Sequence, residues 1–304
     1  MTRTTRTARS APFSGDDNFI QGSPDALREV LDEDDRGGGT CEILSPGRLQ
    51  AILESTSAEP QLEVRGANYT RVLGSLHDEL RPSRYLEIGT LTGGTLQLAS
   101  CASIAIDPRF QIDAEVIGEK PELHLYQETS DDFFALRDSS EVLGGPIDLV
   151  FLDGMHLFEF VLRDFMNIEK CCRPNSIIAI HDCVPSDPYM AVRSSSDPLR
   201  QRSSHPEWWT GDVWKLIPVL RQHRPTLGIQ VLDSQPTGLV VITNLDPDSN
   251  TLELQYESIL KSWQDMGLDE YTMSRFSKDC DLQSADDLIF ADTLKSRFRL
   301  SESS

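Results

Sequence analysis

Positive charge is scarce in this sequence. Lys and Arg together number 28 against 49 Asp and Glu, so the formal net charge is −21. A surface this acidic repels phosphate backbones and anionic lipid headgroups. Nucleic acid is therefore not an expected partner, and solubility is the simplest role for the excess of acids.

Long apolar runs and paired cysteines are also missing. No run approaches the roughly 20 apolar residues that a membrane-spanning helix needs, so we expect no membrane association. The cysteines show neither a Cys-x-x-Cys spacing nor the density of a disulfide framework. Reduced thiols in a cytoplasmic protein are the simplest interpretation. The cysteines are Cys41, Cys101, Cys171, Cys172, Cys183 and Cys280.

The chain is large enough for one α/β domain with additions, having 304 residues of which 38% are hydrophobic. Residues 1–60 are predicted to form a disordered start and a short helical extension. Residues 61–245 are predicted to form the main domain, and residues 246–304 an acidic, partly helical tail. The predicted helices of these two extensions span residues 23–33, 46–57, 252–265 and 285–298.

The main domain alternates short, continuously apolar segments with segments of helical periodicity. Strands of a parallel sheet that is covered on both faces are continuously apolar, so the pattern predicts such a sheet. The fold class is α/β, Rossmann-like and doubly wound, with a mostly parallel sheet of seven strands. The predicted strands span residues 85–88, 103–106, 123–127, 147–152, 176–180, 229–232 and 239–243. The predicted helices span residues 62–80, 93–100, 158–172 and 213–222.

A glycine-containing turn after the first strand is the most informative segment. Its order is Glu87-x-Gly89-x-x-x-Gly93-Gly94-Thr95. Glycines let the backbone turn tightly and let a ligand approach the amides at the start of a helix. A dinucleotide site needs G-x-G-x-x-G to seat a pyrophosphate, which Glu87 would repel. Glu87 suits a cationic ligand such as S-adenosylmethionine, although glycine is also common in such turns for structural reasons alone.

Polar residues follow the second and third strands as well. Asp107 ends the second strand about 20 residues after Gly89, where an acid accepts hydrogen bonds from ribose hydroxyls. It would otherwise cap the turn that begins at Pro108, and NAD-binding folds share the ribose acid. After the third strand, Ser130 or Asp131 would meet the adenine, with a helix N-cap at Ser130 as an equal alternative.

The fourth and fifth strands each end in an acid and a histidine. Asp153 precedes His156, and His181 precedes Asp182. Neighbouring strand ends lie only about 5 Å apart, so the two carboxylates are expected to face one volume beside the cofactor. Like charges there repel, and a divalent cation would offset the repulsion.

Three interpretations of these strand ends stay open. In the first, Asp153 and Asp182 hold Mg²⁺ or Mn²⁺, which lowers the pKa of a substrate hydroxyl. In the second, His156 or His181 acts as a general base. In the third, the acids cap loops and pair with an arginine, Arg163 or Arg193.

Together these segments resemble the class I S-adenosylmethionine-dependent methyltransferases. The likeness rests on residues 87–95, Asp107, 151–156 and 180–183, and it spans about residues 62–244. It is greatest for the small-molecule O-methyltransferase group that includes macrolide-sugar methyltransferases and cephalosporin-hydroxylase-like proteins. Segments 210–215 and 236–239 also resemble bacterial members.

The resemblance implies a role for several residues. Glu87 and Gly89 would line the methionine end, Asp107 the ribose, and Asp153 and Asp182 the metal. Catechol-type enzymes have Asn after the second metal acid, whereas Cys183 stands here, so the third metal ligand is open. The tryptophans at 208, 209 and 214 would form a substrate wall or lid, although core packing is the role that we expect for Trp214.

The predicted function is methyl transfer from S-adenosylmethionine to a hydroxyl of a small molecule, with a divalent metal as an optional aid. The alternatives are an NAD-dependent oxidoreductase and a non-catalytic binding or scaffold protein. A homo-oligomer is compatible with each of these three functions. The expected cofactor-binding residues are Glu87, Gly89, Thr90, Gly93, Asp107, Ser130 and Asp153. The catalytic candidates are His156, His181 and Asp153, and the metal candidates are Asp153 and Asp182.

Overall fold

The computed structural model describes residues 62–289 and residue 294, which belong to one compact unit. The helices predicted at 23–33 and 46–57, and the disordered start, lie outside the described residues. The helix predicted at 285–298 is described only to residue 289 and at residue 294, and its first part is the 3₁₀ turn η4 (Asp286–Ile289).

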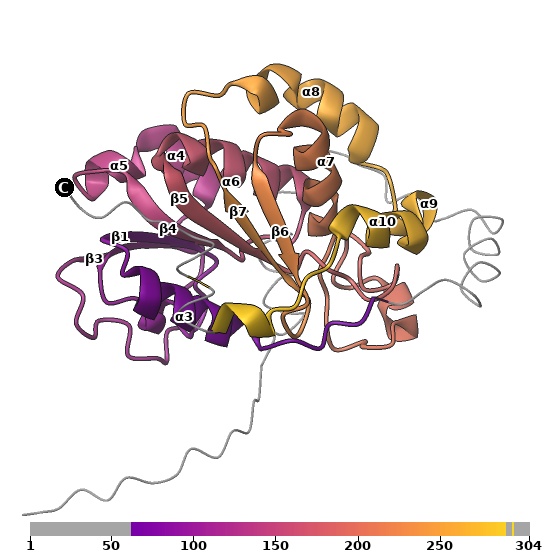
Figure 1. The fold of residues 1–304 in the computed structure, drawn as a ribbon, viewed down its shortest axis with the longest axis horizontal. Helices are drawn as coiled ribbons and strands as arrows, with labels where there is room; N and C mark the ends of the chain where they lie inside the picture. Colours follow the sequence, from indigo (N-terminus) through magenta and orange to yellow (C-terminus); the bar gives the residue numbers. More distant parts are fainter. Residues whose placement is uncertain (1–61, 290–293, 295–304) are drawn as a thin grey trace, which may run out of the picture. The chain divides into compact units, whose positions relative to one another are not determined.

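A seven-stranded sheet forms the centre of the described fold, in the order β3-β2-β1-β4-β5-β7-β6 (Figure 1). The strand β7 runs antiparallel to both of its neighbours, and the other pairs are parallel. The predicted Rossmann-like, mostly parallel sheet is therefore confirmed. The strands are β1 (Arg84–Ile88), β2 (Ala102–Ile106), β3 (Leu123–Tyr126), β4 (Ile147–Leu152), β5 (Cys172–His181), β6 (Gly228–Leu232) and β7 (Leu239–Thr243).

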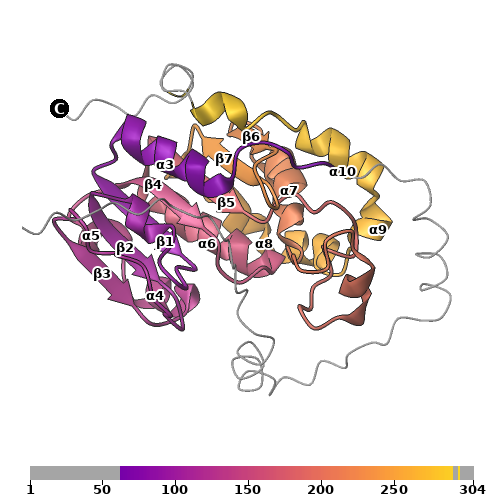
Figure 2. The ribbon, with the colours of Figure 1, turned by 90° about the horizontal axis from the view of Figure 1, so that it is seen from below.

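Helices cover both faces of this sheet, which explains why its strands are continuously apolar. One face packs against α3 (Tyr69–Leu80), η1 (Leu96–Leu98) and η4, as Figure 2 shows from below. The other face carries the larger core, with Phe133 of α4, Phe165 of α6 and Leu220 of α7. The helices on or beside that face are α4 (Ser130–Leu136), α5 (Ser139–Val142), α6 (Phe158–Lys170), η3 (Val213–Lys215), α7 (Leu216–His223), α8 (Thr251–Trp263), α9 (Leu268–Tyr271) and α10 (Met273–Cys280).

The register of the strands aligns their carboxyl ends. Ile88 pairs with Ile106 and with Leu152, and Leu152 pairs with Ile180. The next residue of each strand therefore lies at the same edge of the sheet. The strand order reverses between β1 and β4, and such a switch point opens a crevice where ligands bind in α/β folds.

Two predicted helices differ from the structure more than the others do in their bounds. The segment predicted as a helix at 93–100 contains only the short turn η1. Leu91 (φ 44°) and Gly93 (φ 84°) have left-handed backbones, and a right-handed helix cannot continue through such residues. The helix predicted at 62–80 begins at Tyr69, where the Asn68 side chain accepts a hydrogen bond from the Thr70 amide.

The segment after residue 245 contributes to the main core instead of forming a separate tail. Trp214 is fully buried and contacts the rings of Trp263, Tyr271 and Phe276 from α8, α9 and α10. The core position expected for Trp214 is thus confirmed. Within residues 62–289, no helix has both the length and the apolar character that crossing a bilayer requires.

Candidate functional site

The turn after β1 is shaped by close backbone contacts. Gly89 (φ 86°) and Gly93 (φ 84°) adopt left-handed conformations that favour glycine. A Cβ atom on Gly89 would stand 2.0 Å from the carbonyl oxygen of Asp153, and one on Gly93 would stand 2.5 Å from Val116. Gly89 therefore allows the β1 turn to touch the tip of β4, and Gly93 allows it to pack against Val116.

Glu87 lies fully buried beneath this turn. Its Oε2 atom accepts a 2.6 Å hydrogen bond from the Tyr85 hydroxyl, while Oε1 has no partner among the described residues. Burial raises the pKa of Glu87 to about 7, although hydroxyls of Tyr85, Thr90 and Thr95 act against the rise. A buried acid with an unmatched oxygen has the chemistry to receive a cationic group.

Asp107 stands at the tip of β2 and holds the neighbouring loop. Its two oxygens accept hydrogen bonds from the amides of Leu91, at 2.8 Å, and Arg109, at 2.7 Å. Each carboxylate oxygen retains a second lone pair. The capping role and the ribose role that the sequence suggested are thus compatible.

The segment after β3 corrects one alternative. The N-cap of α4 is Thr129, whose hydroxyl accepts from the Asp132 amide, so Ser130 is the first helical residue and not the cap. Asp131 pairs with Arg163 through both of its oxygens, at 2.8 and 2.6 Å. Ser130 stays a candidate for contact with the adenine.

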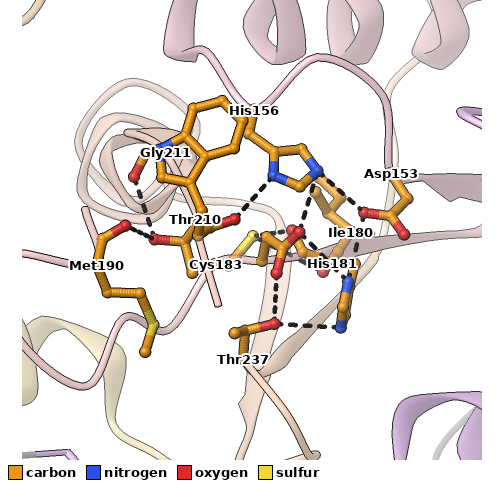
Figure 3. Close-up of polar contacts among 11 residues, drawn as sticks. Asp153, His156, Ile180, His181, Cys183, Met190, Thr210, Gly211 and Thr237 are labelled. Atoms are coloured by element: carbon orange, nitrogen blue, oxygen red, sulfur yellow. Dashed lines mark hydrogen bonds and ion pairs between the residues drawn. The ribbon is translucent and has the colours of Figure 1, made fainter. Parts of the chain in front are cut away.

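The acids and histidines of β4 and β5 converge at the strand tips (Figure 3). His156 Nε2 lies 3.1 Å from Asp182 Oδ2 and 3.6 Å from Asp153 Oδ1. His181 Nδ1 lies 3.3 Å from Asp153 Oδ1 and 3.5 Å from Asp182 Oδ2. Each carboxylate therefore faces both imidazoles, and neither acid pairs with Arg163 or Arg193, which bind other acids.

The far nitrogens of both histidines also have acceptors. His156 Nδ1 lies 3.0 Å from the Trp209 carbonyl oxygen. His181 Nε2 lies 3.3 Å from the hydroxyl of Thr237, which donates its own proton to Asp182. With acceptors on both sides, each ring is best satisfied as an imidazolium.

The electrostatics of the cluster agree with these contacts. Burial alone would lower the pKa of each histidine, but Asp182 and Asp153 raise it, to about 9 for His156 and about 10 for His181. Burial would raise the pKa of Asp153, but His181 and His156 hold it well below its usual range. Two positive and two negative groups thus balance one another.

The backbone around this cluster is unusual at one point. Asp182 has a left-handed backbone (φ 57°), which costs of order 1 kcal/mol or more in a non-glycine residue. Its carboxylate is held by Thr237 from the loop before β7.

An aromatic ring also packs against the cluster. The Tyr69 ring from α3 stacks on His181, with the ring centroids 3.9 Å apart.

Three of these groups have the composition of a metal site. Asp153, His181 and Asp182 offer ligand atoms that lie within 4.8 Å of one another. Two carboxylates and an imidazole fit Mn²⁺, and Mg²⁺ if waters complete its shell. Cys183 is fully buried and its thiol faces the His181 carbonyl oxygen at 3.3 Å, so His181 and not Cys183 offers the third candidate ligand atom.

Sequence reasoning missed Tyr69, and it noted segment 236–239 by resemblance without giving Thr237 a role. Thr237 lies 55 positions from Asp182 along the chain. Tyr69 is the first residue of α3, which precedes β1, and it reaches His181 only in the folded chain. Of the two neighbouring tryptophans, Trp209 stacks on His156, with centroids 5.2 Å apart, and Trp208 stacks on His205 instead. A substrate wall at Trp209 stays a prediction.

A family model described as a methyltransferase domain matches residues 86–183. For this segment, which contains the β1 turn and all four groups of the β4–β5 cluster, the resemblance to methyltransferases is confirmed. A search of curated proteins returns no match to this chain.

Several solved structures resemble the chain at low identity. Cofactor-bound Rv0187 from MTB is 18% identical and has a TM-score of 0.44, covering 74% of this chain and 98% of that chain. The O-methyltransferase TomG from Streptomyces achromogenes, in complex with SAM, is 17% identical with a TM-score of 0.41, covering 58% and 79%. The MycE methyltransferase in complex with Mg, SAH and mycinamycin VI is 20% identical with a TM-score of 0.38, covering 58% and 48%.

Proposed function

We propose that this chain transfers the methyl group of S-adenosylmethionine to a hydroxyl of a small molecule. The observation that carries the proposal is the match of residues 86–183 to a methyltransferase domain, since that segment holds Glu87, Asp107, Asp153 and Asp182. When bound, the cofactor supplies a methyl on a positively charged sulfur, which departs as S-adenosylhomocysteine when the acceptor oxygen attacks.

The cofactor would lie across the tips of β1 and β2. The unmatched Oε1 atom of Glu87 suits the methionine ammonium, and the free lone pairs of Asp107 suit ribose hydroxyls. Gly89 and Gly93 add no side chains of their own to this turn. Acidic groups at these positions favour a cationic nucleoside over one that carries a pyrophosphate.

The acceptor would lie beside the β4 and β5 tips, where the charged cluster meets the β1 turn. Its hydroxyl must lose a proton as the oxygen attacks. Asp153 and Asp182 have lone pairs to accept from this hydroxyl, whereas both nitrogens of each histidine already face acceptors. Because its pKa is low, Asp153 would mainly orient the hydroxyl, and the hydroxyl proton would pass to the Asp182 carboxylate and from there to solvent as the oxygen attacks. Orientation is a large part of catalysis in such displacements.

A divalent cation is part of this proposal as an optional aid held by Asp153, His181 and Asp182. His181 would release its Nδ1 proton to solvent to serve as a ligand, and the cation would then take over the compensation of the two carboxylates. When bound, a cation of this kind lowers the pKa of a coordinated hydroxyl. Tyr69, stacked on His181, and Thr237, bonded to Asp182, would hold two of the three ligands in place.

An NAD-dependent oxidoreductase is the less favoured function. The glycine turn lacks the G-x-G-x-x-G spacing, and buried Glu87 would oppose a pyrophosphate. A scaffold without chemistry is also less favoured, because a protein that binds nothing here gains little from gathering four charged groups, two of them buried, at the strand tips.

The test is turnover of S-adenosylmethionine against a panel of hydroxylated small molecules, with S-adenosylhomocysteine as the readout. The panel is run with EDTA, with Mg²⁺ and with Mn²⁺. Methyl transfer that Asp153→Ala abolishes would support the proposal. Full activity in EDTA would remove the metal from it, and binding of NAD without binding of S-adenosylhomocysteine would refute it.

A further inference from the structure

Residues 209–212, which lead into η3, contact His156 at three points. The Trp209 carbonyl oxygen accepts a 3.0 Å hydrogen bond from His156 Nδ1, and the Trp209 ring stacks on the imidazole. The Asp212 amide donates to the His156 carbonyl oxygen at 3.2 Å. Gly211, beside His156 in Figure 3, packs so closely that a Cβ on it would stand 1.8 Å from the same oxygen. The position of His156 therefore depends on this segment.

The buried carboxylate of Asp212 holds the segment in place. Its Oδ1 atom accepts a 2.7 Å hydrogen bond from the amide of Phe158, the first residue of α6 and only two residues after His156. Its Oδ2 atom accepts from Arg193 and, at 2.7 Å, from Lys215 Nζ. One side chain thus joins the start of α6, the loop after β5 and η3.

The two cations bound to this carboxylate are themselves fixed by other partners. Arg193 donates to both oxygens of Glu159, at 3.0 and 2.6 Å. Lys215 is fully buried and also donates to the carbonyl oxygen of Gln264 at 2.8 Å. Two positive and two negative side chains therefore balance in one network. Such a network resists displacement, because a charge that loses its partner stays buried.

His156 stands between this network and the strand-tip cluster. Its Nε2 atom lies 3.1 Å from Asp182 Oδ2, while its Nδ1 atom and its carbonyl oxygen are held by residues 209–212. A shift of that segment would therefore move the imidazole away from Asp182. A displacement of about 1 Å at a reacting group can cost about a hundredfold in rate.

We propose that Asp212 is a positioning residue for methyl transfer, because it holds His156 against Asp182. This inference rests on the proposed function, in which Asp182 receives the proton of the acceptor hydroxyl. Asp212 acts through the segment that it anchors, and its own oxygens are occupied by the amide and the two cations.

The sequence of residues 210–215 fits this role. Gly211 permits the close approach to the loop after β4, and its left-handed backbone (φ 54°) favours glycine. Asp212 joins the three elements, and Lys215 supplies one of the two cations. The segment therefore has a physical task beside the core packing of Trp214.

The first measurement follows the ring N–H of His156 by NMR of the full chain with isotope-labelled histidine, where His156→Gln identifies the signal by its loss. We expect Asp212→Asn to speed exchange of this proton with water by about tenfold or more, since Asn carries no charge to hold the two cations. Glu169→Gln is the matched control, because Glu169 is another buried acid paired with an arginine, Arg224. It should keep the wild-type exchange rate.

Gly211→Ala tests the same contact without changing any charge. Its Cβ would collide with the His156 carbonyl oxygen, so the segment must move away. We expect faster exchange of the ring proton, as in Asp212→Asn, and this variant gives the answer if Asp212→Asn does not fold. Gly144→Ala is its control, since Gly144 also has a left-handed backbone (φ 65°) but a Cβ there would meet nothing within 4 Å.

Turnover and cofactor binding connect this contact with the reaction. Asp212→Asn and Gly211→Ala should each lower kcat about tenfold or more and keep the affinity for S-adenosylhomocysteine within about twofold of wild type. Unchanged exchange of the His156 proton in both variants, or an unchanged kcat despite faster exchange, would overturn the inference and leave the proposed function standing. A folded wild type that binds no S-adenosylhomocysteine would refute the proposed function and, with it, the role of Asp212 in the reaction.

Discussion

At the scale of single residues, burial changes the ionisation of acids in the site, and Glu87 is the clearest example. It is fully buried, and burial raises its pKa from 4.5 to about 7. At pH values between 4.5 and about 7, Glu87 therefore keeps its proton in the folded chain and has released it in the unfolded chain. The contribution of Glu87 to the free energy of unfolding is therefore greatest below pH 4.5 and is lost as the pH rises through about 7.

We predict that Glu87→Gln flattens this dependence. Denaturant unfolding of the ligand-free chain at several pH values from 4.5 to 7.5 should give a wild-type free energy of unfolding that falls relative to that of Glu87→Gln. The exposed Glu63, in Glu63→Gln, is the control and should follow the wild type. Parallel curves for wild type and Glu87→Gln would show that Glu87 ionises normally in the fold.

Asp107 carries the second residue-scale prediction. Asp107→Ala removes a charge-assisted acceptor from the proposed ribose site and should weaken binding of S-adenosylhomocysteine by about 1–3 kcal/mol. Asp113→Ala changes an exposed acid nearby and should bind as the wild type does. Calorimetry on both variants gives the answer, and an unchanged affinity in Asp107→Ala would contradict the ribose assignment.

The acids at the strand ends could be located from the sequence because a buried apolar strand followed by a carboxylate is a local pattern. Asp107, Asp153 and Asp182 all stand at the edge where that pattern places them. The contacts of His181 with Tyr69 and Thr237 could not be located, because they depend on how distant segments meet. The carboxylate contacts of Asp212 likewise depend on packing that no local pattern reports.

At the scale of elements, the β1 turn depends on glycine for two separate reasons. Gly89 needs a left-handed backbone, and its Cα approaches the β4 tip too closely to carry a Cβ. Gly118 also has a left-handed backbone (φ 49°), but a Cβ there would meet nothing within 4 Å. Comparing substitutions at Gly89 and Gly118 therefore distinguishes the cost of backbone strain from the cost of steric contact.

We predict that Gly118→Ala costs about 1–2 kcal/mol of stability and leaves cofactor binding intact. Gly89→Ala should cost more than that, because the Asp153 backbone must also move, and it should lower the affinity for S-adenosylhomocysteine. Thermal unfolding and calorimetry on both variants measure the two effects. Equal losses in the two variants would mean that the β1 turn can move away from β4 freely.

Elements with a strong period were easier to predict than the turns between them. The strand at residues 239–243 has the predicted bounds, and α6 ends two residues before its predicted end. The helix expected at 93–100 failed because φ values above zero at Leu91 and Gly93 override the helical pattern of the apolar residues. Helix propensity is a weak prior where the backbone has to fit against a neighbouring strand.

At the scale of the whole molecule, the C-terminal helices belong to the same core as the sheet. Phe276 of α10 is fully buried against Trp214, although its surroundings in the sequence are polar and acidic. We expect Phe276→Ala to lower the free energy of unfolding by about 3–5 kcal/mol. Leu254→Ala on the exposed side of α8 should change it by less than about 0.5 kcal/mol.

Denaturant unfolding of both variants, each followed through one cooperative transition, measures the difference between their losses in free energy of unfolding. A loss in Phe276→Ala as small as that in Leu254→Ala would mean that the C-terminal helices are not part of the cooperative unit. The high charge after residue 245 explains why the sequence suggested a tail, since a few buried aromatic residues are enough to dock these helices.

The central claim is that acidic groups at the tips of β1 and β2 receive a cationic nucleoside. Calorimetric titration of the full chain with S-adenosylmethionine, its product S-adenosylhomocysteine and NAD tests it most directly. We predict saturable binding of the first two compounds with one site per chain, and no measurable binding of NAD. A folded sample that takes up neither S-adenosyl compound would contradict the account.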